Sequence, residues 1–187
     1  MEKYNKRWDK LKKILLGVLS YIIFLILYFI QTNFFSWFTI AGISPNLFII
    51  FILFLGLFTD NIFSIVLALI TGITLDFAGA KTVGITALMF CTIAIIASYF
   101  DKNFSKENKI SIIVMIVGMT IVFEGASYFL NAFIMDTTIE GVIFLRILAI
   151  EILYNTLLSL IFYGLIMKAG YRLERTFKHK NILTRYF

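Results

Sequence analysis

The feature that most constrains this chain is a succession of long apolar runs separated by short polar segments. The first run extends from Ile14 to about Phe35 and follows a segment, 1–13, that holds six lysines and arginines. About 20 such residues suffice for a helix to cross the hydrocarbon core of a membrane. The run is too long for the ~7–15-residue apolar region of a signal peptide, and no A-x-A cleavage site follows. We therefore expect it to remain as the first membrane helix.

The composition favours an integral membrane protein without catalytic chemistry. Hydrophobic residues make up 60% of the sequence and charged residues 15%, whereas soluble domains carry about 25% charged residues. The single cysteine, Cys91, and the single histidine, His179, lie far apart in the sequence, which argues against a zinc site, a haem site or a Cys–His pair. The sequence contains no Walker, GxSxG or HExxH motif. We expect no catalytic residues, no cofactor and no metal.

Five further apolar runs predict five further helices. Pro45 suits the first position of a helix, where its missing N–H is no loss, and Ser44 can cap that helix. The second and third helices are short for full spans at about 1.5 Å per residue. A bent hairpin that does not cross the membrane is therefore an alternative for these two. The expected bounds of the five helices are about 45–58, 62–77, 83–100, 110–133 and 142–168.

The positions of the basic residues indicate the orientation. Of the 17 lysines and arginines, six lie in residues 1–13, three in 101–109 and six from Lys168 onward. With six membrane helices all three segments lie on one side, which the positive-inside rule identifies as the cytoplasm. We expect an all-α membrane domain over 14–168 and cytoplasmic basic segments at 1–13 and 169–187. Basic residues gathered at helix ends predict topology and do not predict nucleic-acid binding.

Four charged side chains and one amide in the expected helices are candidates for a packing or functional role. Asp76, Glu124 and Arg146 map to the outer half of the bilayer, and Glu151 and Asn155 map nearer to its middle. A charge in lipid costs about 2.5–3.5 kcal/mol on insertion scales, so such residues tend to face the bundle and to pair. We expect Arg146 to pair with Glu124 or Asp76 and to hold the helices in register. A proton or substrate relay and the binding of a partner helix are the alternatives.

The stretch from Gly72 to Leu88 combines one of these acids with several glycines. Gly72 and Asp76 are one helical turn apart, so they share a face, and small residues let helices approach closely. Gly79 and Gly84 lie in the turn that follows. Close packing within the protein and a groove for an outside helix are both open interpretations.

These motifs resemble those of the rod shape-determining MreD family. The likeness lies in the Gly72-x-x-x-Asp76 pattern, the turn glycine Gly79, the segment Gly84-Ile85-Thr86-Ala87-Leu88, the upstream Pro45-Asn46-Leu47, and Asn155 and Tyr163 in a late helix. Lys81 departs from the family pattern, which favours small or uncharged residues in this turn.

The resemblance implies a non-enzymatic component of the bacterial rod complex in the cell membrane, where it supports cell shape and side-wall peptidoglycan synthesis. The expected partners are an MreC-like protein, the MreB filament system, and a RodA-type glycosyltransferase with its transpeptidase. The family is also similar in fold to the six-helix substrate-binding subunits of energy-coupling factor transporters.

The residues themselves suggest two alternative functions, a transporter subunit and an enzyme of lipid chemistry. A vitamin-type transporter subunit needs a polar, outward-open cavity, which the four intramembrane charged residues could line. It also needs small residues on its first helix to dock the coupling subunits, and this helix has only Gly17 and Ser20. An enzyme of lipid chemistry is disfavoured because it usually shows clustered histidine, aspartate or arginine near an interface.

Overall fold

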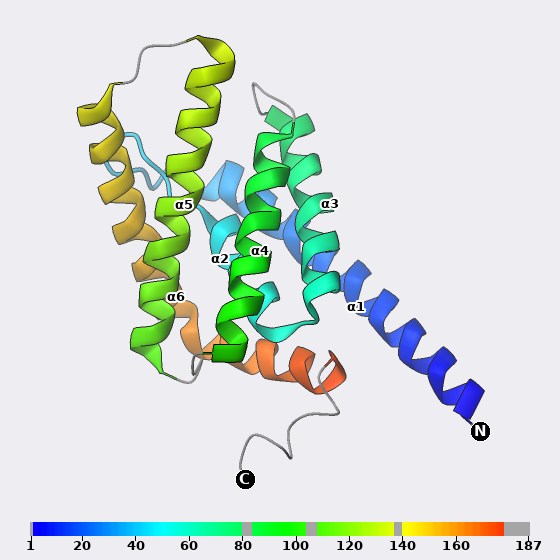
Figure 1. The fold of residues 1–187 in the computed structure, drawn as a ribbon. Coiled ribbons are helices and arrows are strands. Elements are labelled where there is room, and N and C mark those ends of the chain that lie inside the picture. The colour runs from blue at the N-terminus through cyan, green and yellow to red at the C-terminus, as the bar shows by residue number, and fades with distance from the viewer. Residues whose placement is uncertain (1, 80–83, 104–107, 137–139, 178–187) are drawn as a thin grey trace.

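The computed structural model of the protein describes residues 2–79, 84–103, 108–136 and 140–177. Over these ranges the all-α prediction is confirmed, and each of the expected helices is present (Figure 1). The elements are α1 (Glu2–Phe29), the π-helical turn η1 (Ile30–Phe34), α2 (Leu47–Phe58), α3 (Asn61–Gly79), α4 (Ile85–Asn103), α5 (Lys109–Met135) and α6 (Gly141–Phe177).

The helices run back and forth between two ends of the bundle. At one end α3 and α5 finish and α4 and α6 begin, and we call this the Asp76 end (Figure 1). At the opposite end, the Asp60 end, α2 leads into α3 through the short turn at Thr59 and Asp60 (Figure 1). This alternation is what a bundle of membrane helices requires.

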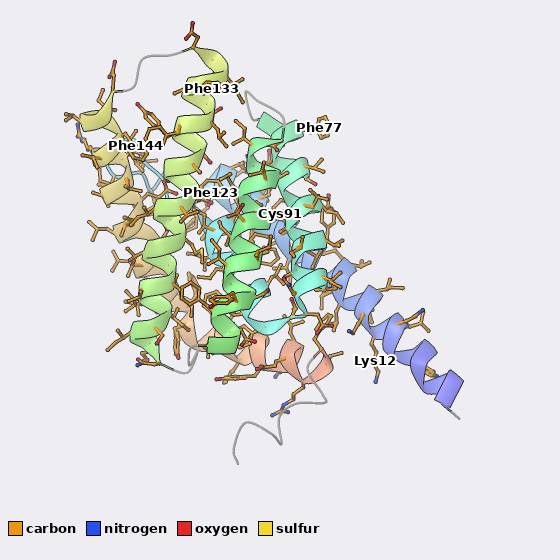
Figure 2. All side chains as sticks on the ribbon, in the orientation of Figure 1. Lys12, Phe77, Cys91, Phe123, Phe133 and Phe144 are labelled. Carbon is orange, nitrogen blue, oxygen red and sulfur yellow. The ribbon has the colours of Figure 1, made fainter. Side chains whose placement is uncertain are left out.

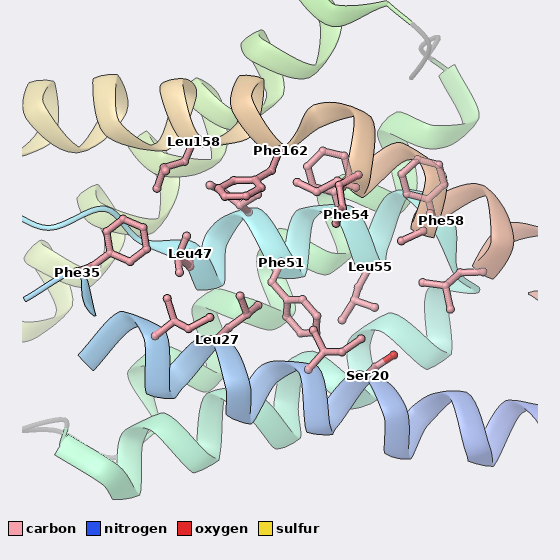
Figure 3. A pocket seen from close by; sticks show the side chains of 18 of the residues that line it. Ser20, Leu27, Phe35, Leu47, Phe51, Phe54, Leu55, Phe58, Leu158 and Phe162 are labelled. Atoms are coloured by element: carbon pink, nitrogen blue, oxygen red, sulfur yellow. The ribbon is translucent and has the colours of Figure 1, made fainter. Parts of the chain in front are cut away.

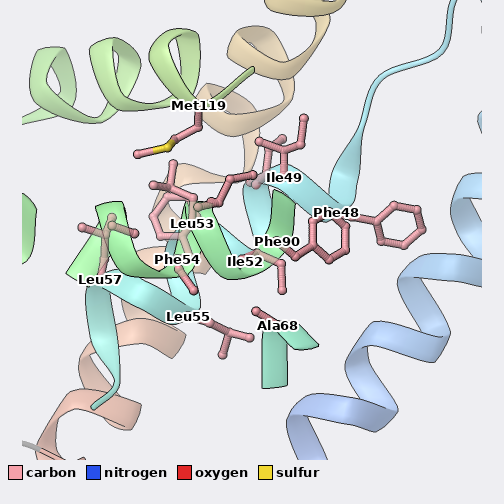
Figure 4. Close-up of a cluster of buried hydrophobic side chains, with 14 of the residues drawn as sticks. Phe48, Ile49, Ile52, Leu53, Phe54, Leu55, Leu57, Ala68, Phe90 and Met119 are labelled. Atoms are coloured by element: carbon pink, nitrogen blue, oxygen red, sulfur yellow. The ribbon is translucent and has the colours of Figure 1, made fainter. Parts of the chain in front are cut away.

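The core of the bundle is α2, which the other helices enclose. Eleven of its 12 residues are buried, as expected for a helix that is apolar on all sides. Ile49, Leu53 and Leu57 are fully buried and lie in one cluster with Phe90 of α4 and Met119 of α5 (Figure 4). The side chains of α2 therefore fix the positions of the surrounding helices.

Four segments of the described chain are long and apolar enough to cross a membrane, namely 10–34, 61–79, 109–135 and 141–177. The other two apolar helices are shorter, with 12 residues in α2 and a 17-residue apolar part, Ile85–Asp101, in α4. Twelve residues cover about 18 Å, which is less than the ~30 Å of a hydrocarbon core. The span count of six therefore stays a prediction.

The first and last helices are longer than their apolar runs. Helix α1 begins at Glu2 instead of Ile14, and α6 continues past Lys168 to Phe177. Lysine, arginine and leucine are good helix formers, so the basic segments can continue the neighbouring helices.

Packing holds the extension of α6 across the Asp60 end of the bundle (Figure 1). The ring of Tyr171 meets Phe58 edge-on with 5.5 Å between centroids, and the ring of Phe177 lies 4.4 Å from that of Phe63. Gly170 is buried against Phe58, where a Cβ atom would lie 2.5 Å from the ring. The alternation of aromatic and basic residues thus gives this segment one face for the bundle and one for its surroundings.

Candidate functional site

The carboxylate of Asp76 caps a neighbouring helix. Asp76 lies near the end of α3 and is only 2% exposed. Its Oδ2 accepts hydrogen bonds from the backbone N–H groups of Gly84 at 2.8 Å and Ala87 at 3.2 Å, and its Oδ1 accepts one from Thr86 at 3.2 Å. The first N–H groups of a helix have no partner within it, and its N-terminus carries partial positive charge. Asp76 of α3 therefore supplies the hydrogen-bond acceptor for the backbone N–H groups at the start of α4.

Gly72 allows this cap to form, because it brings the two backbones together. A Cβ atom at Gly72 would lie 2.3 Å from the Cα of Ala87, which no real contact permits. Gly84 has a φ of +102°, a conformation that glycine adopts readily. We call Gly72, Asp76, Gly84 and Ala87 the α3–α4 joint. Gly79 ends α3 without a neighbour within 4 Å of a Cβ, and Lys81 lies outside the described residues.

A second polar cluster surrounds the N-terminus of α2. The Oδ1 of Asn155, in α6, accepts a hydrogen bond from the backbone N–H of Asn46 at 2.8 Å. The Nδ2 of Asn155 donates to the hydroxyl of Thr120, in α5, at 3.1 Å. Asn155 is fully buried. One amide thus joins three segments that are far apart in the sequence.

The π-helical turn that ends α1 supplies the other support for α2. Gln31 lies in this turn, where its Oε1 accepts a hydrogen bond from the backbone N–H of Leu47 at 3.2 Å and its Nε2 donates to the carbonyl of Pro45. The side chain of Asn46 accepts a bond from the N–H of Ile49 at 3.4 Å, which caps α2 locally. Pro45 and Asn46 are therefore held by both the first and the last helix.

These bonds place the start of α2 deep within the bundle. Thr120 and Asn155 lie in the interiors of α5 and α6, well away from the ends of those helices. Pro45 and Asn46, directly before Leu47, therefore lie at this level, where they are buried or half-buried. Non-helical backbone at membrane depth is tolerated where protein buries it and its polar groups are bonded. This deep start explains why α2 has only 12 residues.

A small hollow opens beside this N-terminus and brings two carboxylates together. Its volume is about 210 Å³. Glu124 of α5 and Glu151 of α6 are close enough to interact with each other, and Glu151 is 5% exposed. The positive end of the α2 dipole favours acidic groups at this position. The residues that line the hollow are Gln31, Ser44, Pro45, Asn46, Phe48, Glu124 and Glu151.

The expected pairing of Arg146 with Glu124 or Asp76 is not found among the described residues. Asp76 turns to the backbone of α4, and Glu124 turns to the hollow at α2. Arg146 is exposed, and its long side chain can extend along the helix toward a polar surface. Within the described ranges the ion pair lies at the Asp60 end instead, between Lys13 and Asp60.

Seven of the predicted site residues therefore form two groups, and the other two belong to neither group. The α3–α4 joint includes Gly72, Asp76 and Gly84, and the cluster at α2 includes Pro45, Glu124, Glu151 and Asn155. Gly79 and Arg146 belong to neither. Sequence reasoning missed the roles of Gln31, Thr120 and Ala87. Of these, Gln31 had a visible signal, because it is an amide near the end of a long apolar run.

The comparisons with known proteins give one finding. No curated protein and no solved structure matches the chain, so the similarity to energy-coupling factor subunits stays a prediction. The family described as rod shape-determining protein MreD matches residues 12–169, which include the α3–α4 joint and the cluster at α2. MreD is not a known enzyme family, and its role is in rod shape determination. The chain therefore belongs to the MreD family of rod shape-determining membrane proteins.

Proposed function

We propose that this protein is a non-enzymatic membrane scaffold or activator of the rod complex. It binds an MreC-like protein, the MreB system and the RodA-type glycosyltransferase with its transpeptidase. The observation that carries this proposal is the three-bond cap that Asp76 makes on α4. Asp76 forms its hydrogen bonds within the protein. The stretch from Gly72 to Leu88 therefore holds α3 and α4 together, and the residues next to it present a surface to partners.

The Asp76 end offers such a surface. Phe77, next to the capping residue, is 76% exposed, and Phe133 near the end of α5 is 88% exposed. Both lie at this end of the bundle (Figure 2). Exposed aromatic side chains are enriched where proteins bind one another. Because the cap fixes the end of α3, it also fixes the place of Phe77 on this surface.

The proposed topology has six membrane crossings with both termini in the cytoplasm. The alternation of helix ends between the Asp76 end and the Asp60 end supports it (Figure 1), as do the three basic segments of the sequence. In this arrangement α2 crosses only the cytoplasmic part of the membrane. The irregular segment between Phe35 and Asn46 connects α1 to α2, and its residues 36–42 are exposed.

Co-purification tests the scaffold function. Wild-type protein and two single variants, Phe77→Ala and Ile62→Ala, are expressed at equal levels and isolated from membranes, and the bound proteins are identified by mass spectrometry. Ile62 is the control because it is 78% exposed and near the opposite end of α3. We expect Phe77→Ala to lower the yield of the MreC-like protein and Ile62→Ala to leave it unchanged.

Two results would contradict the proposal. A wild-type sample without an MreC-like protein or a cell-wall synthase would argue against the scaffold function. Equal yields from both variants would place the docking surface elsewhere. Asp76 is unsuitable for this experiment, because its removal loosens α4 and would lower partner binding indirectly.

The hollow at α2 favours a second candidate, a subunit that binds a small molecule. Glu124 and Glu151 line it as that function requires, but Asp76 and Arg146 do not. Its volume of about 210 Å³ is also below the ~300–1,000 Å³ that is usual for ligand sites. Mass spectrometry of small molecules retained by purified wild type and by Glu151→Gln tests this candidate. A compound lost only in the variant would favour it.

A further inference from the structure

A long apolar groove runs between α1 and α6 with α2 as its floor (Figure 3). Its volume is about 480 Å³. Leu27 of α1, Phe51 and Phe54 of α2, and Leu158 and Phe162 of α6 line its walls (Figure 3). Phe51 is partly exposed in this groove, and the other α2 residues that line it are buried.

The dimensions of the groove suit a hydrocarbon chain. Along α1 and η1 its lining extends from Ser20 to Phe34, a distance of about 21 Å at roughly 1.5 Å per residue. An extended hydrocarbon chain can lie along a groove of this length. The volume of about 480 Å³ is also within the ~300–1,000 Å³ that is usual for sites that hold small, mainly apolar molecules.

The lining disfavours a partner helix. Membrane helices dock closely through small residues, and here the small lining residues Ser20, Ala169 and Gly170 lie at the Asp60 end only. The space above Gly170 is already filled by the ring of Phe58. The rest of the groove presents bulky aliphatic and aromatic side chains, which conform to a flexible chain.

Positive charge gathers where the groove reaches the Asp60 end. Lys168 and Arg172 are exposed and flank the lining residue Ala169 on α6. Lys13 is paired with Asp60, and the acidic Glu174, which is half-buried, lies two residues from Arg172 on the same helix. Phosphate groups bind arginine and lysine through charge-assisted hydrogen bonds.

We propose that the groove holds one acyl chain of an anionic glycerophospholipid, with its phosphate bound by Lys168 and Arg172. The apolar lining receives the chain along the bundle, and the basic residues meet the headgroup at the level where α6 leaves the apolar part of the bundle. The lipid would fill the gap between the first and the last helix and seal α2 from the bulk membrane.

Native mass spectrometry of the full chain tests this site. Detergent-purified protein is delipidated and titrated with phosphatidylglycerol or with phosphatidylcholine of the same acyl chains. We expect one phosphatidylglycerol to bind preferentially. Each basic residue near an anionic surface contributes about fivefold in affinity, so Lys168→Gln with Arg172→Gln should weaken phosphatidylglycerol binding about 25-fold. Phosphatidylcholine binding should be weakened much less, because the choline of this lipid offsets the charge of its phosphate. Arg146→Gln, at the other end of α6, is the charge control.

A filling variant tests the chain position separately. Ala169→Trp places an indole in the groove and should abolish binding of both lipids, whereas Leu153→Trp, at a 65% exposed position of α6 outside the groove, should not. Circular dichroism confirms that each variant is folded. Equal affinity for the two lipids, binding unaffected by Ala169→Trp, or phosphatidylglycerol binding unaffected by the charge variant would each overturn the proposal. A dimer that only Ala169→Trp disrupts would assign the groove to a second copy and would also overturn it.

Discussion

Replacement of Asp76 by alanine is the sharpest test of the α3–α4 joint. The change removes the acceptor of three backbone hydrogen bonds from the start of α4. Because Asp76 is 2% exposed, water cannot replace it, and the freed N–H groups stay unpaired in an apolar environment. A hydrogen bond to a charged acceptor contributes about 1.5–3 kcal/mol. The three bonds share one carboxylate and are not additive, so we expect the free energy of unfolding to fall by about 3–5 kcal/mol.

Equilibrium unfolding of the purified protein in mixed micelles, with increasing sodium dodecyl sulfate and helicity as the signal, measures this loss. Asp76→Asn keeps one amide oxygen as an acceptor and should lose about 1–3 kcal/mol, in proportion to the bonds that remain. Asp60→Ala is the matched control, because its carboxylate is 37% exposed and bound to Lys13. Exposed ion pairs contribute at most about 1 kcal/mol.

An Asp76→Ala protein within about 1 kcal/mol of wild type would refute this account of the joint. Equal losses from Asp76→Ala and Asp60→Ala would do the same, since they would show that burial and the three bonds make no difference. If the account holds, a shape defect caused by Asp76→Ala reflects a loosened helix pair and says nothing about a direct contact with a partner.

Three further changes have expected outcomes in the same unfolding assay. Gly72→Ala should destabilise the protein by about 1–3 kcal/mol through overpacking, because its Cβ meets the backbone of α4, whereas Gly118→Ala has open space and should be neutral or slightly stabilising. Asn155→Leu should cost about 1–3 kcal/mol, since it leaves the partly buried backbone N–H of Asn46 without its acceptor, and faster hydrogen exchange at that N–H would confirm the cause. Lys13→Gln should lower the free energy of unfolding by less than about 1 kcal/mol, and added salt should reduce this loss. A loss that does not depend on salt would contradict the description of Lys13 and Asp60 as an exposed ion pair.

The helices were predictable because apolar runs of this length have few alternatives. The sequence also predicted that Asp76 and Gly72 share one face, because the helical repeat determines this spacing. It did not predict what that face meets. Depth along a helix follows from residue counts, but the rotation of each helix follows from packing. The partner of Asp76 is a set of backbone N–H groups, which have no signature in the side-chain sequence.

The same reasoning explains the error over Arg146. A pairing between opposite charges was expected at similar depth, but α5 and α6 turn Glu124 and Glu151 toward the hollow and leave Arg146 exposed. The extension of α6 to Phe177 was not predicted, because the many basic residues of this segment indicated a polar tail. The structure shows that its aromatic residues share one face, since the rings of Tyr171 and Phe177 pack on the Asp60 end.

The bond between Asn46 and Asn155 has a consequence for biogenesis. The two residues are 109 positions apart, so α2 is synthesised and leaves the ribosome long before its anchor in α6 exists. Until then its deep N-terminus lacks the acceptor that later holds it. The innermost helix would thus be the last to reach its final position, and a chain truncated before Asn155 would contain every residue of α2 without the means to seat it.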